Sequence, residues 1–228
     1  MIELKNVELI LRGFKLNNIS FRINNSEITY LVGNNGSGKT TLLKCALDII
    51  KINKGRILFD GDSFKKKKNK IMFIQDNPLF YEDYSGLDNL LFINDKLDLE
   101  ELSKVCELFT FSKKLLHRQV YRYSFGERKK LAIINSLIND YDYYFLDEPT
   151  IGLDLQTWYL YKKCLIYLKE NKKTILVTGH NYEMIEEIAD NIIIINNGKI
   201  LINEKLNNFI GNYHSLYERL RVFYNIDI

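Results

Sequence analysis

A glycine-rich stretch near the N-terminus constrains this chain more than any other feature. It begins at Gly33 and, after four further residues, continues as Gly38-Lys39-Thr40. Apolar residues typical of a buried strand precede it at 28–32, and a helical pattern follows at 42–47. Strand, glycine loop and helix in this order form the P-loop arrangement. The sequence therefore predicts an α/β protein that binds the phosphates of a nucleoside triphosphate.

The residue types of this loop suit phosphate binding. Backbone N–H groups that open onto a helix N-terminus converge on phosphate oxygens, and glycine permits the left-handed path that the loop needs. We expect Lys39 to reach the β- and γ-phosphates, Thr40 to help hold Mg²⁺ and Thr41 to contact the α-phosphate. The predicted nucleotide-binding residues of the loop are Asn34, Asn35, Gly36, Ser37, Gly38, Lys39, Thr40 and Thr41. A ligand-free glycine turn is the alternative, which the spacing and the flanking pattern disfavour.

Bulk properties exclude several classes of protein. The 228 residues are enough for one domain, or for one domain with an insertion. A net charge of +3 is too small to indicate nucleic acid binding. The N-terminus has no signal-peptide pattern, and no run approaches the roughly 20 apolar residues of a membrane span. The three cysteines are far apart in the sequence, as in a cytosolic protein with reduced thiols. A function at a membrane would therefore require a partner protein.

Strand signals fall in two groups, separated by a helical section. The first 23 residues alternate as two antiparallel strands that are joined near Arg12-Gly13. From residue 76 to about 138 the strand signals give way to helical patterns. Apolar strands then return and alternate with helices, which favours a parallel, buried sheet. The predicted strands of this sheet lie at 28–32, 71–74, 143–146 and 174–178, with a hairpin at 192–202.

These patterns predict an α/β core with a mixed, mainly parallel sheet, an antiparallel β part and an inserted helical subdomain. The expected boundaries are 1–75 and 137–205 for the nucleotide-binding core, 76–136 for the helical subdomain and 206–228 for a short C-terminal tail. The run Lys65-Lys66-Lys67-Lys68 is expected to be a solvated helix face or loop, with electrostatic membrane contact as the alternative.

Two acids follow the hydrophobic strand at 143–146. A buried strand delivers such carboxylates to its C-terminal end, where α/β sheets bind ligands. We expect Asp147 to orient Mg²⁺ and Glu148 to act as the general base that polarises the attacking water. Two acids after a strand are often only the start of an exposed loop. The presence of a P-loop favours the catalytic interpretation.

Four further segments accompany these motifs in a specific order. Gln75 ends the strand at 71–74, and Tyr123-Ser124-Phe125-Gly126-Glu127 precedes a helix at 131–137. Pro149-Thr150-Ile151-Gly152-Leu153-Asp154 directly follows the two acids, and His180 follows the strand at 174–178. With these segments the chain resembles, over nearly its whole length, the ATP-binding subunit of an ABC transporter. The resemblance implies a single ABC ATPase domain over residues 1–228 that binds ATP and Mg²⁺ and hydrolyses ATP.

The resemblance also implies roles for individual residues. It implies that Gln75 contacts Mg²⁺ and the water, that His180 hydrogen-bonds the γ-phosphate and that Asp154 crosses a dimer interface. Ser124 and Gly126 would bind the γ-phosphate held by the opposite subunit. The family signature is usually Leu-Ser-Gly-Gly-Gln, and here Tyr123, Phe125 and Glu127 replace its first, third and fifth residues. A plain capping box of Ser124 with Glu127 is the alternative, and both interpretations can hold together.

The resemblance finally implies partners and a place of action. We expect a homodimer, or a heterodimer with a paralogue, on a separate multi-pass membrane permease, peripheral to the cytoplasmic face of the cell membrane. Phe125 in the signature and the short tail after residue 205 favour export of a drug, antimicrobial peptide or similar cargo over import. The alternative is a soluble ABC ATPase without transport, such as an iron–sulfur assembly type. For contact with the adenine ring, Phe14 and Leu11 both remain candidates.

Overall fold

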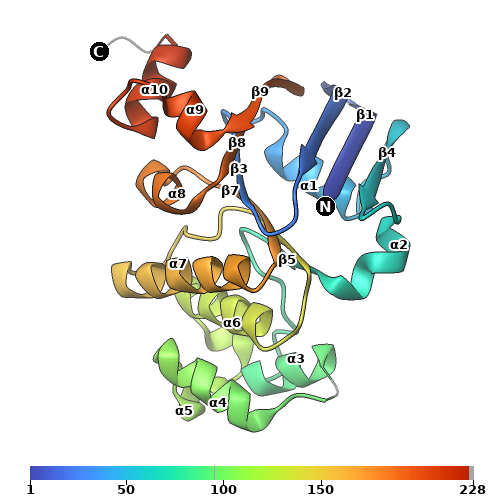
Figure 1. The fold of residues 1–228 in the computed structure, drawn as a ribbon. Coiled ribbons are helices and arrows are strands. Elements are labelled where there is room, and N and C mark those ends of the chain that lie inside the picture. Colours follow the sequence, from blue (N-terminus) through green and yellow to red (C-terminus); the bar gives the residue numbers. More distant parts are fainter. Residues whose placement is uncertain (95, 226–228) are drawn as a thin grey trace.

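The computed structural model describes residues 1–94 and 96–225 and places them in two sheets with surrounding helices (Figure 1). The smaller sheet is antiparallel, with the order β2-β1-β4. Its strands are β1 (Ile2–Leu11), β2 (Phe14–Ile23) and β4 (Lys54–Phe59). The predicted pair of N-terminal strands with a turn at Arg12-Gly13 is confirmed.

The larger sheet has six strands in the order β5-β6-β7-β3-β8-β9. Five of them are parallel, and only β9 runs antiparallel, as the partner of β8 in the predicted hairpin. The strands are β3 (Ile28–Val32), β5 (Ile71–Ile74), β6 (Tyr143–Leu146), β7 (Thr174–Thr178), β8 (Asn191–Asn196) and β9 (Lys199–Lys205). The predicted mixed, mainly parallel sheet is therefore confirmed.

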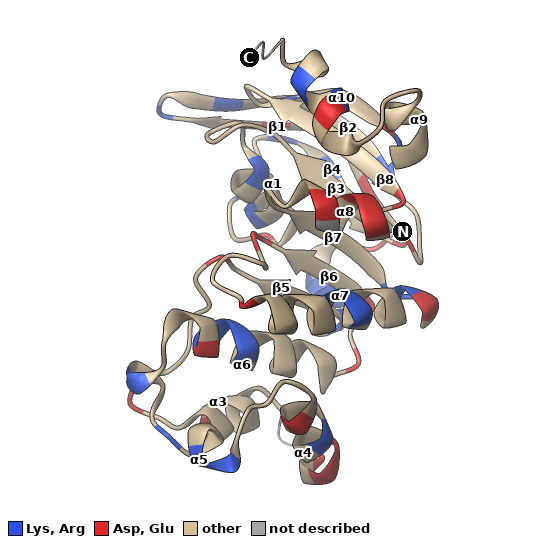
Figure 2. Ribbon diagram, turned by 90° about the vertical axis from the view of Figure 1, so that its left-hand side faces the viewer, with Lys and Arg blue, Asp and Glu red and all other residues tan. Residues whose placement is uncertain are grey.

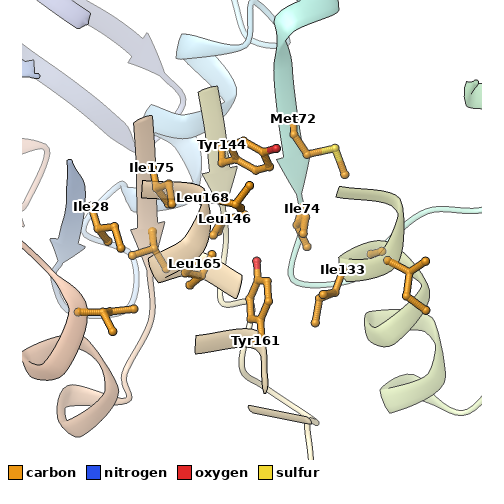
Figure 3. Close-up of a cluster of buried hydrophobic side chains, with 14 of the residues drawn as sticks. Ile28, Met72, Ile74, Ile133, Tyr144, Leu146, Tyr161, Leu165, Leu168 and Ile175 are labelled. Atoms are coloured by element: carbon orange, nitrogen blue, oxygen red, sulfur yellow. The ribbon is translucent and has the colours of Figure 1, made fainter. Parts of the chain in front are cut away.

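Both faces of this sheet are covered, which explains its continuous apolar strands. Successive residues of β6 point to opposite faces, so that Tyr144 and Leu146 join one buried cluster while Tyr143 and Phe145 join another. Figure 3 shows the first cluster, in which Tyr144 and Leu146 lie on the same side of the sheet as the helix residues Tyr161 and Leu165. The second cluster lies between the sheet, α1 (Lys39–Ala46) and the smaller sheet. This core fixes the strand ends that carry the site.

Between β5 and β6 the chain forms helices, and the part of it that the structure describes contains no strand there. These helices occupy the lower part of Figure 1. They are α3 (Gly86–Ile93), α4 (Leu99–Leu108), α5 (Lys113–Leu116), the 3-10 turn η2 (Val120–Arg122) and α6 (Phe125–Leu137). The helix α6 packs against β5 and α4, so it connects this region with the sheet. Asp95 falls outside the described residues.

The remaining helices complete the fold. They are α2 (Phe64–Lys67) with the 3-10 turn η1 (Lys68–Lys70), α7 (Leu155–Glu170), α8 (Tyr182–Ile188), α9 (Leu206–Ile210) and α10 (Leu216–Phe223). The lysine run expected as a helix face or loop forms α2 and the start of η1. The C-terminal tail forms two helices, and α10 packs against α8 and α9. None of the helices in the described part of the chain is long and apolar enough to span a bilayer.

Candidate active site

The carboxyl ends of four neighbouring parallel strands bring the predicted residues together. Gln75 follows β5, Asp147 follows β6, Gly179 follows β7 and Gly33 follows β3. The register pairs Ile74 with Leu146, so the residues that follow these two lie at the same edge of the sheet. Motifs that are more than 100 residues apart in the sequence therefore meet where α/β sheets bind ligands.

The P-loop, residues 33–41, has the backbone path that its glycines predict. Gly36 and Gly38 have φ angles of 78° and 112°, in the left-handed region. A β-carbon on Gly33 would lie 2.3 Å from the carbonyl oxygen of Ile195, and one on Gly38 would lie 2.6 Å from Cζ of Phe14. Only glycine fits these positions, and α1 begins directly after Gly38.

Lys39 is buried inside this loop. Its ammonium donates hydrogen bonds to the carbonyl oxygens of Gly33 at 2.7 Å and of Asn34 at 3.4 Å. Burial lowers the pKa of Lys39, and the nearby carboxylates of Glu148 and Asp147 oppose that shift. The loop therefore holds a positive charge at its centre, where its N–H groups converge.

Asp147 joins the P-loop to the sheet. Its side chain is buried, with 3% of the residue exposed. One carboxylate oxygen accepts a hydrogen bond from Oγ1 of Thr40 at 2.8 Å, and the other accepts one from Oγ1 of Thr178 at 2.8 Å. Hydroxyl and carboxylate oxygens are ligands that Mg²⁺ prefers. The described residues contain no cluster of three or more His, Cys, Asp or Glu side chains that would hold a metal alone.

Glu148 has an unusual backbone and an unsatisfied oxygen. Its φ of 48° is in the left-handed region, which costs free energy for a residue with a side chain. Its N–H donates to Oγ1 of Thr178 at 3.0 Å. Its Oε1 lies 3.4 Å from Nε2 of His180, while its Oε2 is buried and accepts no hydrogen bond from the described part of the chain. Burial raises the pKa of Glu148, and the neighbouring His180 opposes that shift.

His180 lies next to this carboxylate, in the histidine loop, which we define as residues 179–182. Its side chain is 47% exposed, whereas that of Glu148 is 14% exposed. The imidazole therefore lies between the buried acid and the solvent.

Two residues that contribute to the site, Thr178 and Lys129, were not predicted from the sequence. Thr178 accepts from the Glu148 N–H and donates to Asp147, so it fixes both acids. Lys129 is fully buried, and its ammonium donates to the carbonyl oxygen of Glu148 at 2.9 Å and lies 3.4 Å from Oδ1 of Asp76. It also lies 5.5 Å from the ring centroid of Phe125. A threonine at the end of a strand and a lysine one helical turn after Phe125 are the signals that could have identified them.

The N-terminus of α6 carries the predicted signature residues. Ser124 and Glu127 form the capping box that was the alternative interpretation: the Ser124 Oγ accepts from the Glu127 N–H at 3.2 Å, and the Glu127 carboxylate accepts from the Ser124 N–H at 2.7 Å. A β-carbon on Gly126 would lie 2.9 Å from the carbonyl oxygen of Gly152. Within the described ranges, no hydrogen bond or ion pair joins Ser124 or Gly126 to the P-loop.

Asp154 and Gln75 have local contacts. Asp154 caps α7 by accepting from the N–H and the hydroxyl of Thr157, at 2.8 and 3.0 Å, and it pairs with Lys130 at 3.2 Å. The hydrogen bond from the Thr157 backbone is the main reason that the pKa of Asp154 falls to about 2. The carbonyl oxygen of Gln75 lies 3.5 Å from the ammonium of Lys129. Roles of both residues toward a ligand or a partner subunit stay predictions.

The two adenine candidates differ in their surroundings. Phe14 is half-buried, with its ring against the backbone at Gly38. Leu11 is exposed at the tip of the β1–β2 hairpin, beside the exposed Ile10. An apolar surface at this hairpin thus adjoins the P-loop through Phe14, and the choice between the two residues stays open.

Comparison with known proteins gives the same family throughout. A family model described as ABC transporter matches residues 16–151. The ABC transporter ATP-binding protein NatA of Bacillus subtilis is 30% identical over 218 residues, which cover 89% of this chain and 84% of that protein. The lantibiotic transport ATP-binding protein SrtF of Streptococcus pyogenes is 31% identical over 197 residues, 83% of this chain and 84% of that protein. An uncharacterised relative from Synechocystis is longer, and the match spans 57% of its length.

Solved structures agree on the fold. An ATP-binding subunit of an ABC transporter superposes with a TM-score of 0.88 over 98% of this chain and 99% of that one, at 20% identity. An ATP-binding cassette of an ABC transporter in its ADP conformation superposes with a TM-score of 0.77 over 98% of both chains, at 21% identity. The predicted ABC ATPase fold is therefore confirmed.

Proposed function

Because the chain belongs to the ABC transporter family, as an ATP-binding and ATP-hydrolysing subunit, we propose that it is the motor of a separate membrane permease and that it drives export. One observation carries the catalytic part of the proposal. The buried Oε2 of Glu148 accepts no hydrogen bond from the described residues. The same carboxylate adjoins His180, and Glu148 follows β6, which only β7 separates from the P-loop strand β3. Such an oxygen suits a group that must accept a proton from water.

The nucleotide site is formed by the P-loop. We assign the phosphate contacts to the backbone N–H groups of residues 34–40 and to the ammonium of Lys39, which already lies inside the loop. Ser37 supports this assignment, since its buried hydroxyl has no hydrogen-bond partner in the described part of the chain. A phosphate oxygen would accept from such a group and replace the loop carbonyls as partner of Lys39.

The residues present also fit Mg²⁺. Thr40 and Asp147 share a hydrogen bond between two hard oxygen atoms, and Gln75 adds an amide at the adjacent strand end. Mg²⁺ is typically bound through one or two protein oxygens together with phosphates, which agrees with this sparse donor set. We propose that Thr40, Asp147 and Gln75 hold the ion, which would neutralise charge on the β- and γ-phosphates.

Glu148 then acts as the base. Its raised pKa reflects burial, and it favours acceptance of a proton as the water oxygen bonds to the γ-phosphorus and the bond from that phosphorus to the β-phosphate oxygen breaks. The water proton goes to the Glu148 carboxylate, and the electron pair of the broken bond stays on ADP. His180 donates a hydrogen bond to the γ-phosphate and orients it toward the water.

Each site is completed by a second subunit in this proposal. Ser124 and Gly126 lie at the start of α6 (Figure 2), without a bond to the P-loop of their own chain in the described ranges. The partner is a second copy or a paralogue, and hydrolysis then depends on dimerisation.

An exposed aromatic surface shortly after Gln75 supports a permease partner. The rings of Tyr81, Tyr84 and Phe92 contact one another edge to face, with centroids 5.1–6.2 Å apart, and Leu79 beside them in sequence is 76% exposed. Grouped apolar side chains of this kind mark interaction surfaces. We propose that an apolar segment of the permease docks here, so that its motion reaches the site through Gln75. The chain would then work peripherally, at the cytoplasmic face of the membrane.

Export of a peptide-like cargo is supported by Phe125 in the signature and by the similarity to a protein named for lantibiotic transport. A soluble ATPase without transport, such as an iron–sulfur assembly type, is the alternative. Affinity capture of the tagged Glu148→Gln protein from gently solubilised cells separates the two. We expect a multi-pass membrane protein in stoichiometric amount, and we expect Tyr84→Glu to lose it while Tyr167→Glu, an exposed tyrosine on α7, keeps it. A soluble partner, retained by both variants, would contradict the transport function.

A further inference from the structure

The histidine loop is held from behind by a tyrosine of the strand that leads into the P-loop. Tyr30 lies in β3, three residues before Gly33, and is fully buried. Its hydroxyl donates a hydrogen bond to the carbonyl oxygen of Gly179, the residue directly before His180. The bond joins positions 149 residues apart in the sequence. A single strand thus carries the phosphate loop and supports the loop that bears the histidine.

Gly179 also adjoins Glu148, the proposed base. A β-carbon on Gly179 would lie 3.5 Å from Oε2 of Glu148, the oxygen that accepts no bond from the described residues. A small displacement of this backbone would therefore change the surroundings of that oxygen as well as the position of His180. The hydroxyl of Tyr30 acts on the carbonyl of this same residue.

The other side of the histidine loop is held by the C-terminal helix. The ring of Tyr182, at the start of α8, lies on the ring of Tyr217 in the first turn of α10, with centroids 6.2 Å apart and a tilt of 41°. The Leu216 N–H donates to Glu186 of α8 at 2.8 Å, and the Leu216 side chain is fully buried. These contacts fix α10 to the helix that begins where the histidine loop ends (Figure 1).

A cavity extends from α10 to Glu148. It has a volume of about 610 Å³ and is lined by Glu148 and His180 as well as by Ser215 and Tyr217. Burial, followed by the charge of Glu148, raises the pKa of Tyr182, which agrees with the closeness of this ring to the acid. The C-terminal helix thus lines a cavity that reaches both proposed catalytic residues, Glu148 and His180.

We propose that Tyr30 and Tyr217 are positioning residues for ATP hydrolysis, which hold the histidine loop from the β3 side and from the α10 side. Tyr30 fixes the carbonyl of Gly179, and Tyr217 fixes the ring of Tyr182. The C-terminal helix thereby sets the position of His180 relative to Glu148, without contact with the nucleotide. This inference rests on the catalytic roles proposed above for Glu148 and His180.

The test compares kcat with nucleotide binding in the dimeric protein. Tyr30→Phe removes only one hydroxyl. Tyr217→Ala removes the ring of a residue that is 53% exposed, so both variants should fold. We expect kcat for phosphate release to fall about 5- to 10-fold in each, as for the loss of one hydrogen bond or ring contact. KM and the affinity for a fluorescent ATP analogue should change by less than about two-fold, because the P-loop is untouched. Tyr217→Phe keeps the ring and should restore kcat.

Matched controls exist for both variants. Tyr144 is a buried strand tyrosine whose hydroxyl also donates to a backbone carbonyl, that of Ser136 at 3.3 Å, so Tyr144→Phe controls for Tyr30→Phe. Tyr167 on α7 is exposed and controls for Tyr217→Ala. Neither control should lower kcat.

Three results would overturn the proposal. They are native kcat in both variants, a loss of nucleotide affinity in place of kcat, and an equal fall of kcat in the controls. The assignment of Glu148 as the base is tested separately, because phosphate release by Glu148→Gln at the parent rate would contradict it. The effect of each tyrosine variant is read as the ratio of its kcat to the kcat of the parent protein.

Discussion

Replacement of Lys129 by methionine separates catalysis from stability in this protein. The ammonium of Lys129 is fully buried and donates to the carbonyl oxygen of Glu148 at 2.9 Å. A hydrogen bond with a charged donor contributes about 1.5–3 kcal/mol. If this bond holds Glu148 in its left-handed conformation during hydrolysis, its loss should lower kcat by about 10- to 100-fold.

The free energy of unfolding should change much less. Burial lowers the pKa of Lys129, so the folded protein tolerates this charge at a cost. Methionine removes that cost, fills a similar volume and can keep contact with the ring of Phe125. We expect the free energy of unfolding to differ from that of the parent by less than about 1.5 kcal/mol.

The assay is phosphate release at saturating ATP and Mg²⁺, with urea unfolding of the same samples. Lys173→Met is the matched control, because the Lys173 side chain is only 16% exposed, pairs with Asp140 at 2.5 Å and precedes β7, at the end of the strand opposite to the site. Its kcat should be unchanged. Native kcat in Lys129→Met would refute the idea that the lysine orients Glu148, and so would an equal loss in both variants.

Three further variants test individual contacts. Thr178→Val removes the hydroxyl that hydrogen-bonds both Asp147 and Glu148. We expect kcat to fall at least about ten-fold while the nucleotide affinity stays within about three-fold. An unchanged kcat would contradict the idea that this hydroxyl positions the two acids. Glu148→Gln should raise the melting temperature more at pH 7.5 than at pH 4. The raised pKa means that the folded state disfavours the charged carboxylate, and this cost grows as the pH rises from the ordinary carboxyl pKa through the raised one. Scanning calorimetry that shows no gain at pH 7.5 would argue against it. Asp154→Ala should lower the free energy of unfolding by about 0.5–2 kcal/mol through loss of the α7 cap. Since the pKa of Asp154 is depressed to about 2, that difference should be full above pH 4 and fade toward pH 2, which urea titrations at both pH values would show or disprove.

The sequence predicted the sheet well because its signals are local. Continuous apolar runs such as 143–146 and 174–178 must be buried on both faces, and the turn Asn196-Asn197-Gly198 allows only a tight hairpin. The partner of β4 could not be predicted. This strand pairs with β1, about 50 residues earlier, and such long-range pairing leaves no mark in a short segment.

The support of the site was hidden for the same reason. Lys129 reaches Glu148 only because α6 packs on β5 and because the backbone of Glu148 turns into the left-handed region. Asp154 and Ser124 show the reverse case. The sequence offered a cap only for Ser124, as the alternative to its signature role, and Asp154 was expected at a dimer interface. The structure uses both side chains as caps, a local role that the family resemblance does not state. The P-loop was predictable because its glycine positions and its chemistry lie in one continuous segment.

The most direct test of the central claim is a single measurement on Glu148→Gln. ATP binding and phosphate release are recorded for this variant and for the parent protein under saturating Mg²⁺. The buried carboxylate beside His180 predicts that the variant binds ATP with native affinity, releases almost no phosphate and accumulates as a dimer. Phosphate release at the parent rate would show that Glu148 is not the base and would contradict the assignment of this site.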